Sequence, residues 1–213
     1  MKALLLKDWY ILVKQARWSF MLIFVFIFVS IVGKGTVFYA LIATMVCSML
    51  PVSTMAYDQM SRWDVYVLAL PFSKKDIVYS KYLLVLISIS LSLVLMILLN
   101  GIVAVLPIKA MTMNQMGQVL CLQAILGLLF SAINYPIIFK LGVEKGRALY
   151  MIINFFLMAI VGALLSLKGG DFKNISYGTS IPFAQLLYFL LGALCIWLLS
   201  VFISFRFSNK REL

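Results

Sequence analysis

The chain contains six apolar blocks of the kind that cross a bilayer, and none holds a Lys, Arg, Asp or Glu. The first block is short and would have to take in residues that precede it. A membrane-spanning helix needs about 17–25 mostly apolar residues, and in lipid its backbone must satisfy its hydrogen bonds internally. At 64% hydrophobic residues, the chain has too few polar groups to cover a soluble surface. The predicted fold class is all-α integral membrane with six transmembrane helices. The blocks are Trp18–Val32, Val37–Tyr57, Tyr82–Leu106, Gln118–Phe139, Ala148–Leu167 and Phe183–Phe205.

The positive charge is distributed unevenly between the two sides that these spans define. Of the 18 Lys and Arg residues, only Lys34, Lys109, Lys168 and Lys173 fall on one side, and the rest share the other side with both termini. The positive-inside rule therefore predicts a multi-pass membrane protein with both termini in the cytoplasm. Topology and attraction to anionic headgroups account for the net charge of +11, so no nucleic-acid partner is expected.

Several kinds of site lack their usual residues. The chain has no His, the residue on which zinc sites, haem sites and Ser–His catalysis usually depend. We expect no catalytic, metal-binding or cofactor-binding residue in it. The spans carry no charged side chain of the kind that lines proton and ion pathways. Among their polar residues, Asn134 and Asn154 are candidates for a weakly polar wall of a translocation path. The alternative is that such amides hydrogen-bond neighbouring helices.

The first 17 residues predict a helix lying in the headgroup plane. At 100° per residue, Lys7, Asp8 and Lys14 fall on one face of this helix, opposite its apolar face. The alternative is that the segment extends the first span. The apolar face, with Trp9 as the interfacial anchor, carries Leu5, Trp9, Leu12 and Val13.

The loop between the second and third spans contains the run LPFSKKDIVYSKY at residues 70–82. Pro71 discourages helix before it, Ser73 is a good N-cap, and Asp76 suits the positive end of the helix that follows. The predicted helix covers about two turns, up to Ser80, and is too short to be stable alone in water. We therefore expect it to pack on the membrane, the rest of the chain or a partner. The alternative is a solvated loop with interfacial aromatic residues.

This loop resembles the corresponding segment of small permeases in the type-two ATP-binding-cassette (ABC) exporter superfamily. The residues that carry the resemblance are Asp58, Trp63, Tyr66 and the run from Leu70 to Tyr82, together with the opening MKALLLKDWY. Within this superfamily the chain resembles the permeases that export phenol-soluble modulins or related amphipathic peptides from Gram-positive bacteria, which implies a location in a bacterial plasma membrane. Beyond about the first 80 residues, the similarity is one of hydropathy and span number.

The resemblance implies an N-terminal elbow helix, a cytoplasmic coupling helix that docks on an ATPase subunit, and a second permease copy or paralogue. A re-entrant hairpin would map to residues 168–182, where Gly169 and Gly170 depart from that pattern. ATP and Mg²⁺ are expected on the partner ATPase, because this chain has no phosphate-binding loop of the usual spacing. The implied ATPase-coupling residues are Ser73, Lys74, Lys75, Asp76, Ile77, Val78 and Tyr79.

The sequence thus predicts a single permease domain over residues 1–213 that exports hydrophobic or amphipathic cargo, with amphipathic peptides as the first choice. Its parts are an elbow helix (1–17), the first two spans (18–57), a coupling loop (58–81), the remaining spans (82–205) and a cytoplasmic tail (206–213). Two other functions remain open. One is an ATP-independent carrier or channel, and the other is an intramembrane enzyme.

Overall fold

The structure is a computed structural model of the chain. It describes residues 2–15, 17–32, 37–61, 63, 66, 74–105, 112–143, 145–146, 148–149, 152–153, 155–156 and 183–210. Within these ranges the regular structure is helical, and no strand occurs. The helices are α1 (Lys2–Gln15), α2 (Arg17–Val32), α3 (Val37–Met60), α5 (Lys74–Val105), α6 (Met113–Leu141) and α8 (Phe183–Lys210).

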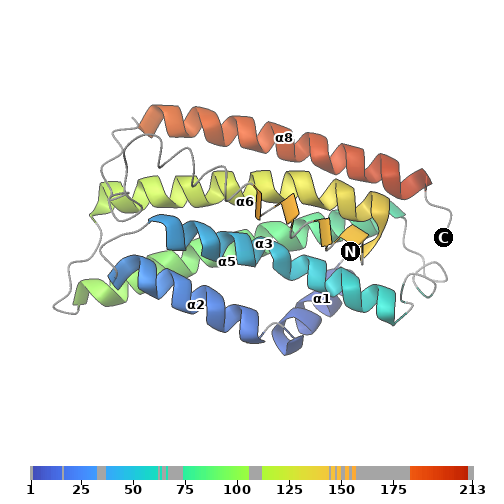
Figure 1. Cartoon of the computed structure of the whole chain (residues 1–213), viewed down its shortest axis with the longest axis horizontal. Coiled ribbons are helices and arrows are strands. Elements are labelled where there is room, and N and C mark those ends of the chain that lie inside the picture. Colours follow the sequence, from blue (N-terminus) through green and yellow to red (C-terminus); the bar gives the residue numbers. More distant parts are fainter. Residues whose placement is uncertain are drawn as a thin grey trace.

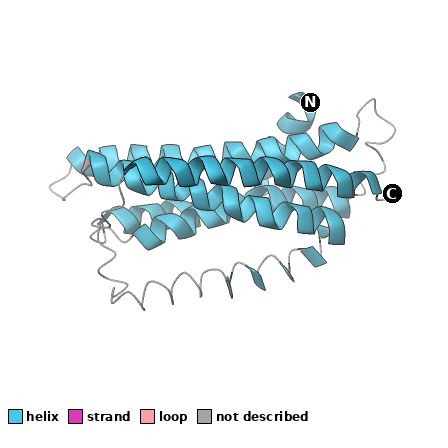
Figure 2. Ribbon diagram, turned by 90° about the horizontal axis from the view of Figure 1, so that it is seen from above, coloured by secondary structure: helices cyan, strands magenta, loops and turns pink. Residues whose placement is uncertain are grey.

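The long helices lie side by side in one bundle, and α1 is turned away from α2 at one end of it (Figures 1 and 2). Helices α3, α5, α6 and α8 are long and apolar enough to cross a membrane, which confirms a multi-pass membrane protein. The first predicted span corresponds to α2, which has 16 residues. Most of the predicted fifth span lies outside the described residues.

Helices α3 and α5 occupy the centre of the bundle and contribute to two apolar cores. The first core joins them to α2, through buried residues such as Ile23 and Ile27. The second joins them to α6 and α8, through residues that include Tyr135 and Trp197. Helix α6 packs along α8 on one side of the bundle (Figure 1). The two cores make α3 and α5 the helices through which the two sides of the bundle meet.

The charged residues of the described ranges gather at one end of the bundle, which we call the basic end. The described Lys, Arg and Asp residues lie on α1, at the start of α2 and α5, or at or just beyond the end of α3, α6 and α8, and these segments meet at the same end in Figure 1. Between this end and the other, the described helices contain no charged side chain. This distribution is the one that the apolar blocks predict.

The start of the third span differs from the prediction. We expected a two-turn helix ending at Ser80, followed by a separate span from Tyr82. Instead, Lys74–Val105 forms one continuous helix of 32 residues, α5. No Pro or Gly interrupts residues 74–82, and Lys81 is buried among partners rather than marking an exit into water. The predicted coupling segment is therefore the first two turns of a membrane-spanning helix.

Candidate functional site

The first two turns of α5 present part of the predicted coupling surface to solvent. Lys75 and Tyr79 are exposed one helical turn apart, and Asp76 and Ile77 are half-buried beside them. Val78, on a neighbouring face of the helix, is buried in the second apolar core. Ser73 lies outside the described residues, and Lys74 begins the helix. The helix thus shows a surface of mixed charge and aromatic character while its inner face fixes it to the bundle.

Two lysines at the basic end lie against aromatic rings of α8. The Nζ of Lys75 is 5.0 Å from the ring centroid of Phe205, and the Nζ of Lys140 is 5.5 Å from that of Phe207. A cation over an aromatic face contributes about 0.5–1 kcal/mol where water has access. These contacts place the exposed start of α5 beside the end of α8.

Two turns into α5, Lys81 lies at the centre of a buried charge cluster that joins three helices. Its Nζ donates to both carboxylate oxygens of Asp8 on α1 at 2.9 Å, to Oδ2 of Asp58 on α3 at 2.6 Å, and to Thr54 Oγ1 at 3.3 Å. The exposed fractions of Lys81, Asp8 and Asp58 are 4%, 1% and 6%. Charges removed from water to this extent require close partners, which each of them has.

Lys7 completes the cluster at its rim. Its Nζ pairs with Oδ1 of Asp58 and lies 3.4 Å from Oδ1 of Asp8. The same Nζ is 4.4 Å from the ring centroid of Trp63, which follows the end of α3. The side chain of Lys7 is 24% exposed, more than those of the other three charged members. We call Lys7, Asp8, Asp58 and Lys81 the charge cluster. Its two cations balance its two carboxylates.

This cluster was not predicted, because charged residues outside the apolar blocks are expected in water. A signal was present in the spacing. Asp8 lies four residues from both Leu4 and Leu12, which are buried on the same face of α1. Lys81 in the same way lies three residues after Val78 and four before Val85, both buried. A charge in register with an apolar stripe indicates a buried ion pair when residues of opposite charge show the same pattern.

Immediately after Lys81, Tyr82 fixes α5 to the other side of the bundle. Its hydroxyl lies 2.8 Å from Ser200 Oγ and 2.6 Å from Ser204 Oγ, both on α8. Its ring centroid is 5.4 Å from that of Tyr135 on α6 and 5.4 Å from that of Trp197 on α8. Two successive residues of α5 therefore contact α1 and α3 in one direction and α6 and α8 in the other.

Helix α1 is a separate helix from α2, as predicted, but the burial of Asp8 differs from the prediction. Asp8, expected on the polar outer face, points into the protein between two buried leucines. Of the predicted interfacial face, Leu12 is buried and Leu5 is half-buried, whereas Trp9 and Val13 are exposed, which does not contradict an interfacial role. The ion pair with Lys81 explains why Asp8 is buried.

The candidate residues for a translocation path are described only in part. Asn134 is fully buried, and its Nδ2 donates to the carbonyl of Phe130 at 2.6 Å. Its Oδ1 has no hydrogen-bond partner in the described part of the chain, and neither does Oε1 of Gln123. Gln123 lies three turns earlier on α6, and its Nε2 donates to the carbonyl of Ala40 on α3. Asn154 lies outside the described residues.

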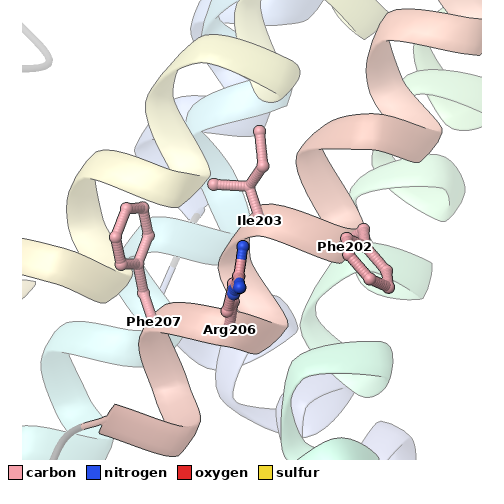
Figure 3. Close-up of a pocket in the computed structure, with 4 residues that line it drawn as sticks. All are labelled: Phe202, Ile203, Arg206 and Phe207. Atoms are coloured by element: carbon pink, nitrogen blue, oxygen red, sulfur yellow. The ribbon is translucent and has the colours of Figure 1, made fainter.

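A hollow of about 400 Å³ lies beside the last turns of α8 (Figure 3). The described residues that line it are Phe202, Ile203, Arg206 and Phe207. Arg206 forms no ion pair within the described ranges. As for metals, the described residues contain no group of three potential ligands.

The comparison with protein families accounts for nearly the whole chain. The model described as ABC-2 family transporter protein matches residues 3–209. The chain belongs to the ABC-2 transporter family. It is therefore a permease subunit of an ABC transporter, and membership of the ABC-2 family implies an ABC ATPase partner in general. Comparisons with individual curated proteins and with solved structures found no match.

Proposed function

We propose that this ABC-2 permease is the membrane subunit of an ATP-driven exporter, and that the first two turns of α5 receive the movement of its ATPase. The single observation that carries this proposal is the continuity of α5 from its exposed tip into the membrane. Because no break separates the tip from the span, a force applied at Lys75 or Tyr79 acts directly on a transmembrane helix. The bonds that Lys81 and Tyr82 make then transmit this force to the neighbouring helices.

The basic end of the bundle is the cytoplasmic end in this proposal, in a bacterial plasma membrane. The gathering of lysines and arginines supports this orientation through the positive-inside rule. The exposed aromatic residues Trp9 and Tyr10 of α1 suit the headgroup region of the same leaflet. The ATPase binds ATP and Mg²⁺, and the permease itself supplies no catalytic group.

The cargo is hydrophobic or amphipathic, with amphipathic peptides of the phenol-soluble modulin type as the first candidates. The apolar middle of the described helices supports this class, since a highly charged cargo would find no matching charge there. The hollow at Arg206 supports it as well. A second permease copy completes the path. The apolar face of α8 supports such pairing, because only 22% of its most apolar window is buried within one chain.

The proposal is tested with the chain affinity-tagged and purified from its own cells together with any bound ATPase. The vanadate-sensitive ATP hydrolysis of the complex is measured in lipid nanodiscs. Lys75→Ala combined with Tyr79→Ala should lower ATPase binding and permease-dependent hydrolysis by about tenfold. Lys14→Ala, an exposed change at the end of α1, is the matched control and should have no effect.

Two results would reject the proposal. The first is a purified wild-type chain with no nucleotide-hydrolysing partner and no ATP-dependent export of amphipathic peptide into inverted vesicles. The second is full hydrolysis by the Lys75→Ala, Tyr79→Ala variant. Cargo movement by liposomes that contain the permease alone would favour the ATP-independent carrier instead.

A further inference from the structure

We propose that the charge cluster makes α1 part of the site that couples the ATPase to the membrane helices. Lys81 is the positioning residue that sets α1, α3 and α5 relative to one another. This inference rests on the proposed function, because it assigns a further element to the same coupling site. It differs from the interfacial role predicted for α1, in which the helix is a passive membrane anchor.

The first argument is the way α1 is attached. Asp8 accepts two hydrogen bonds from Lys81 and is almost fully buried, with Leu4 and Leu12 packed on either side of it. A helix that only rested on the membrane would keep its carboxylate in water. Instead, α1 is joined to α5 directly after the exposed coupling surface, so that the two helices must shift together or break a buried ion pair.

The second argument is the position of Lys7. It connects Asp58 to Trp63, which follows the end of α3. An ATPase that displaces Trp63 pulls on Lys7. The charge cluster thus contacts Trp63 as well as the turn of α5 that follows the docking surface.

The third argument concerns the charge balance of the cluster. With Lys7 in place, two cations face two carboxylates. If Lys7 leaves, Lys81 alone must neutralise both Asp8 and Asp58 in surroundings that exclude water, which is unfavourable. The helices therefore favour a small number of discrete arrangements over gradual deformation, and discrete arrangements are what a coupling element needs.

Stability by itself gives no reason for charges at this place. Apolar residues of similar volume often replace a buried ion pair without loss of stability, whereas removing one partner is strongly destabilising. This contrast allows the mechanical role to be separated from the structural one.

The test uses the full permease with its co-purified ATPase and compares the wild type with Asp8→Leu, Asp58→Leu, Lys81→Met. This triple variant leaves Lys7 as the one remaining charge of the cluster, at the rim where its side chain is 24% exposed and can turn into water, so the complex should assemble with a nearly unchanged melting temperature. Its ATP-dependent peptide export should fall by about tenfold or more. Lys14→Met, the same kind of change on the exposed face of α1, is the matched control and should export like the wild type.

A distance measurement provides a readout that a purely structural role would not change. Spin labels are placed at Tyr10→Cys on α1 and Met113→Cys at the far end of α6, both highly exposed, after Cys47, Cys121 and Cys195 are replaced by Ala. Trapping with ATP and vanadate should change the distance between the labels in the otherwise wild-type protein. In the triple variant the distance should stay constant.

A triple variant that exports normally, or whose label distance changes as in the wild type, overturns the inference and leaves the proposed function intact. If the triple variant does not assemble, Lys7→Met provides the second test, because it removes only the half-exposed member. Lys7→Met should lower export about fivefold while ATPase binding persists, and wild-type export would overturn the inference. A wild-type complex without ATP-dependent export contradicts the proposed function itself.

Discussion

The start of α5 and its middle are held in the bundle by different forces. At the start, Lys81 and Tyr82 make directional bonds to carboxylates and hydroxyls on three other helices, α1, α3 and α8. In the middle, contacts are apolar and depend on shape. A Cβ placed at Gly127 of α6 would lie 3.1 Å from side-chain atoms of Ile89 on α5 and 3.0 Å from Thr44 on α3.

The difference indicates what each part of α5 can do. Directional bonds to a few partners can exchange for an alternative set, so the start can adopt a second arrangement at limited cost. Close packing loses many contacts with any displacement, so the middle is better suited to moving as a rigid unit with its neighbours. Four substitutions test this contrast, in order of decreasing expected effect.

Lys81→Met should be the most damaging single change. It leaves Asp8 and Asp58 buried with only Lys7 nearby, and removing one member of a buried ion pair typically costs about 3–5 kcal/mol. The free energy of unfolding, measured by denaturant titration in mild detergent, should fall by that amount. A Lys81→Met variant as stable as the wild type would contradict the contrast between the two parts of α5, since the cluster would then not contribute to the free energy of unfolding.

Gly127→Val should have the next largest effect. The added side chain collides with Thr44 and Ile89, and overpacking of this kind typically costs about 1–3 kcal/mol. Gly192→Val on α8 is the matched control, because a Cβ there meets no atom within 4 Å. Equal melting temperatures for the two variants would show that shape does not hold the middle of α5.

Tyr82→Phe should cost less, by about 0.5–1.5 kcal/mol. The ring and its contacts with Tyr135 and Trp197 remain, and only the hydroxyl between Ser200 and Ser204 is lost. Differential scanning fluorimetry should show a small decrease in melting temperature. A loss as large as that of Lys81→Met would mean that the two sides of α5 are held equally strongly.

Lys75→Met should have the smallest effect on stability. The cation over Phe205 is exposed to water and contributes about 0.5–1 kcal/mol at most, while the methionine can keep part of the apolar contact. The melting temperature should stay within a degree or two of the wild type, an estimate that follows from the usual scale for small changes in free energy. A large decrease would place a structural anchor where we propose a docking surface.

Much of the fold follows from the sequence because long apolar blocks leave little choice of structure. The predicted spans Val37–Tyr57, Tyr82–Leu106, Gln118–Phe139 and Phe183–Phe205 correspond to α3, α5, α6 and α8. The clustering of charge at one end was predictable for the same reason. The boundaries were less accurate, since α3 and α5 both continue into what was expected to be a coupling loop over residues 58–81.

The candidate site was predicted only in part, for a physical reason. The rule that charges stay out of the membrane places Asp58 and Lys81 in water, but it does not foresee that they can neutralise each other inside the protein. The helical-wheel prediction for α1 was wrong at Asp8, because this carboxylate pairs with a lysine 73 residues away in the sequence. Contacts of that range depend on the tertiary arrangement, which periodicity along one helix does not contain.

The unbroken course of α5 has a geometric consequence. At 1.5 Å per residue the helix is about 48 Å long, and the anchors at Lys81 and Tyr82 lie only about 11 Å from its exposed tip. If these anchors act as a pivot, the part beyond them is about three times longer than the part before them. α5 is then an amplifying lever, in which a displacement of about 2 Å at the ATPase swings the far end by about 6 Å.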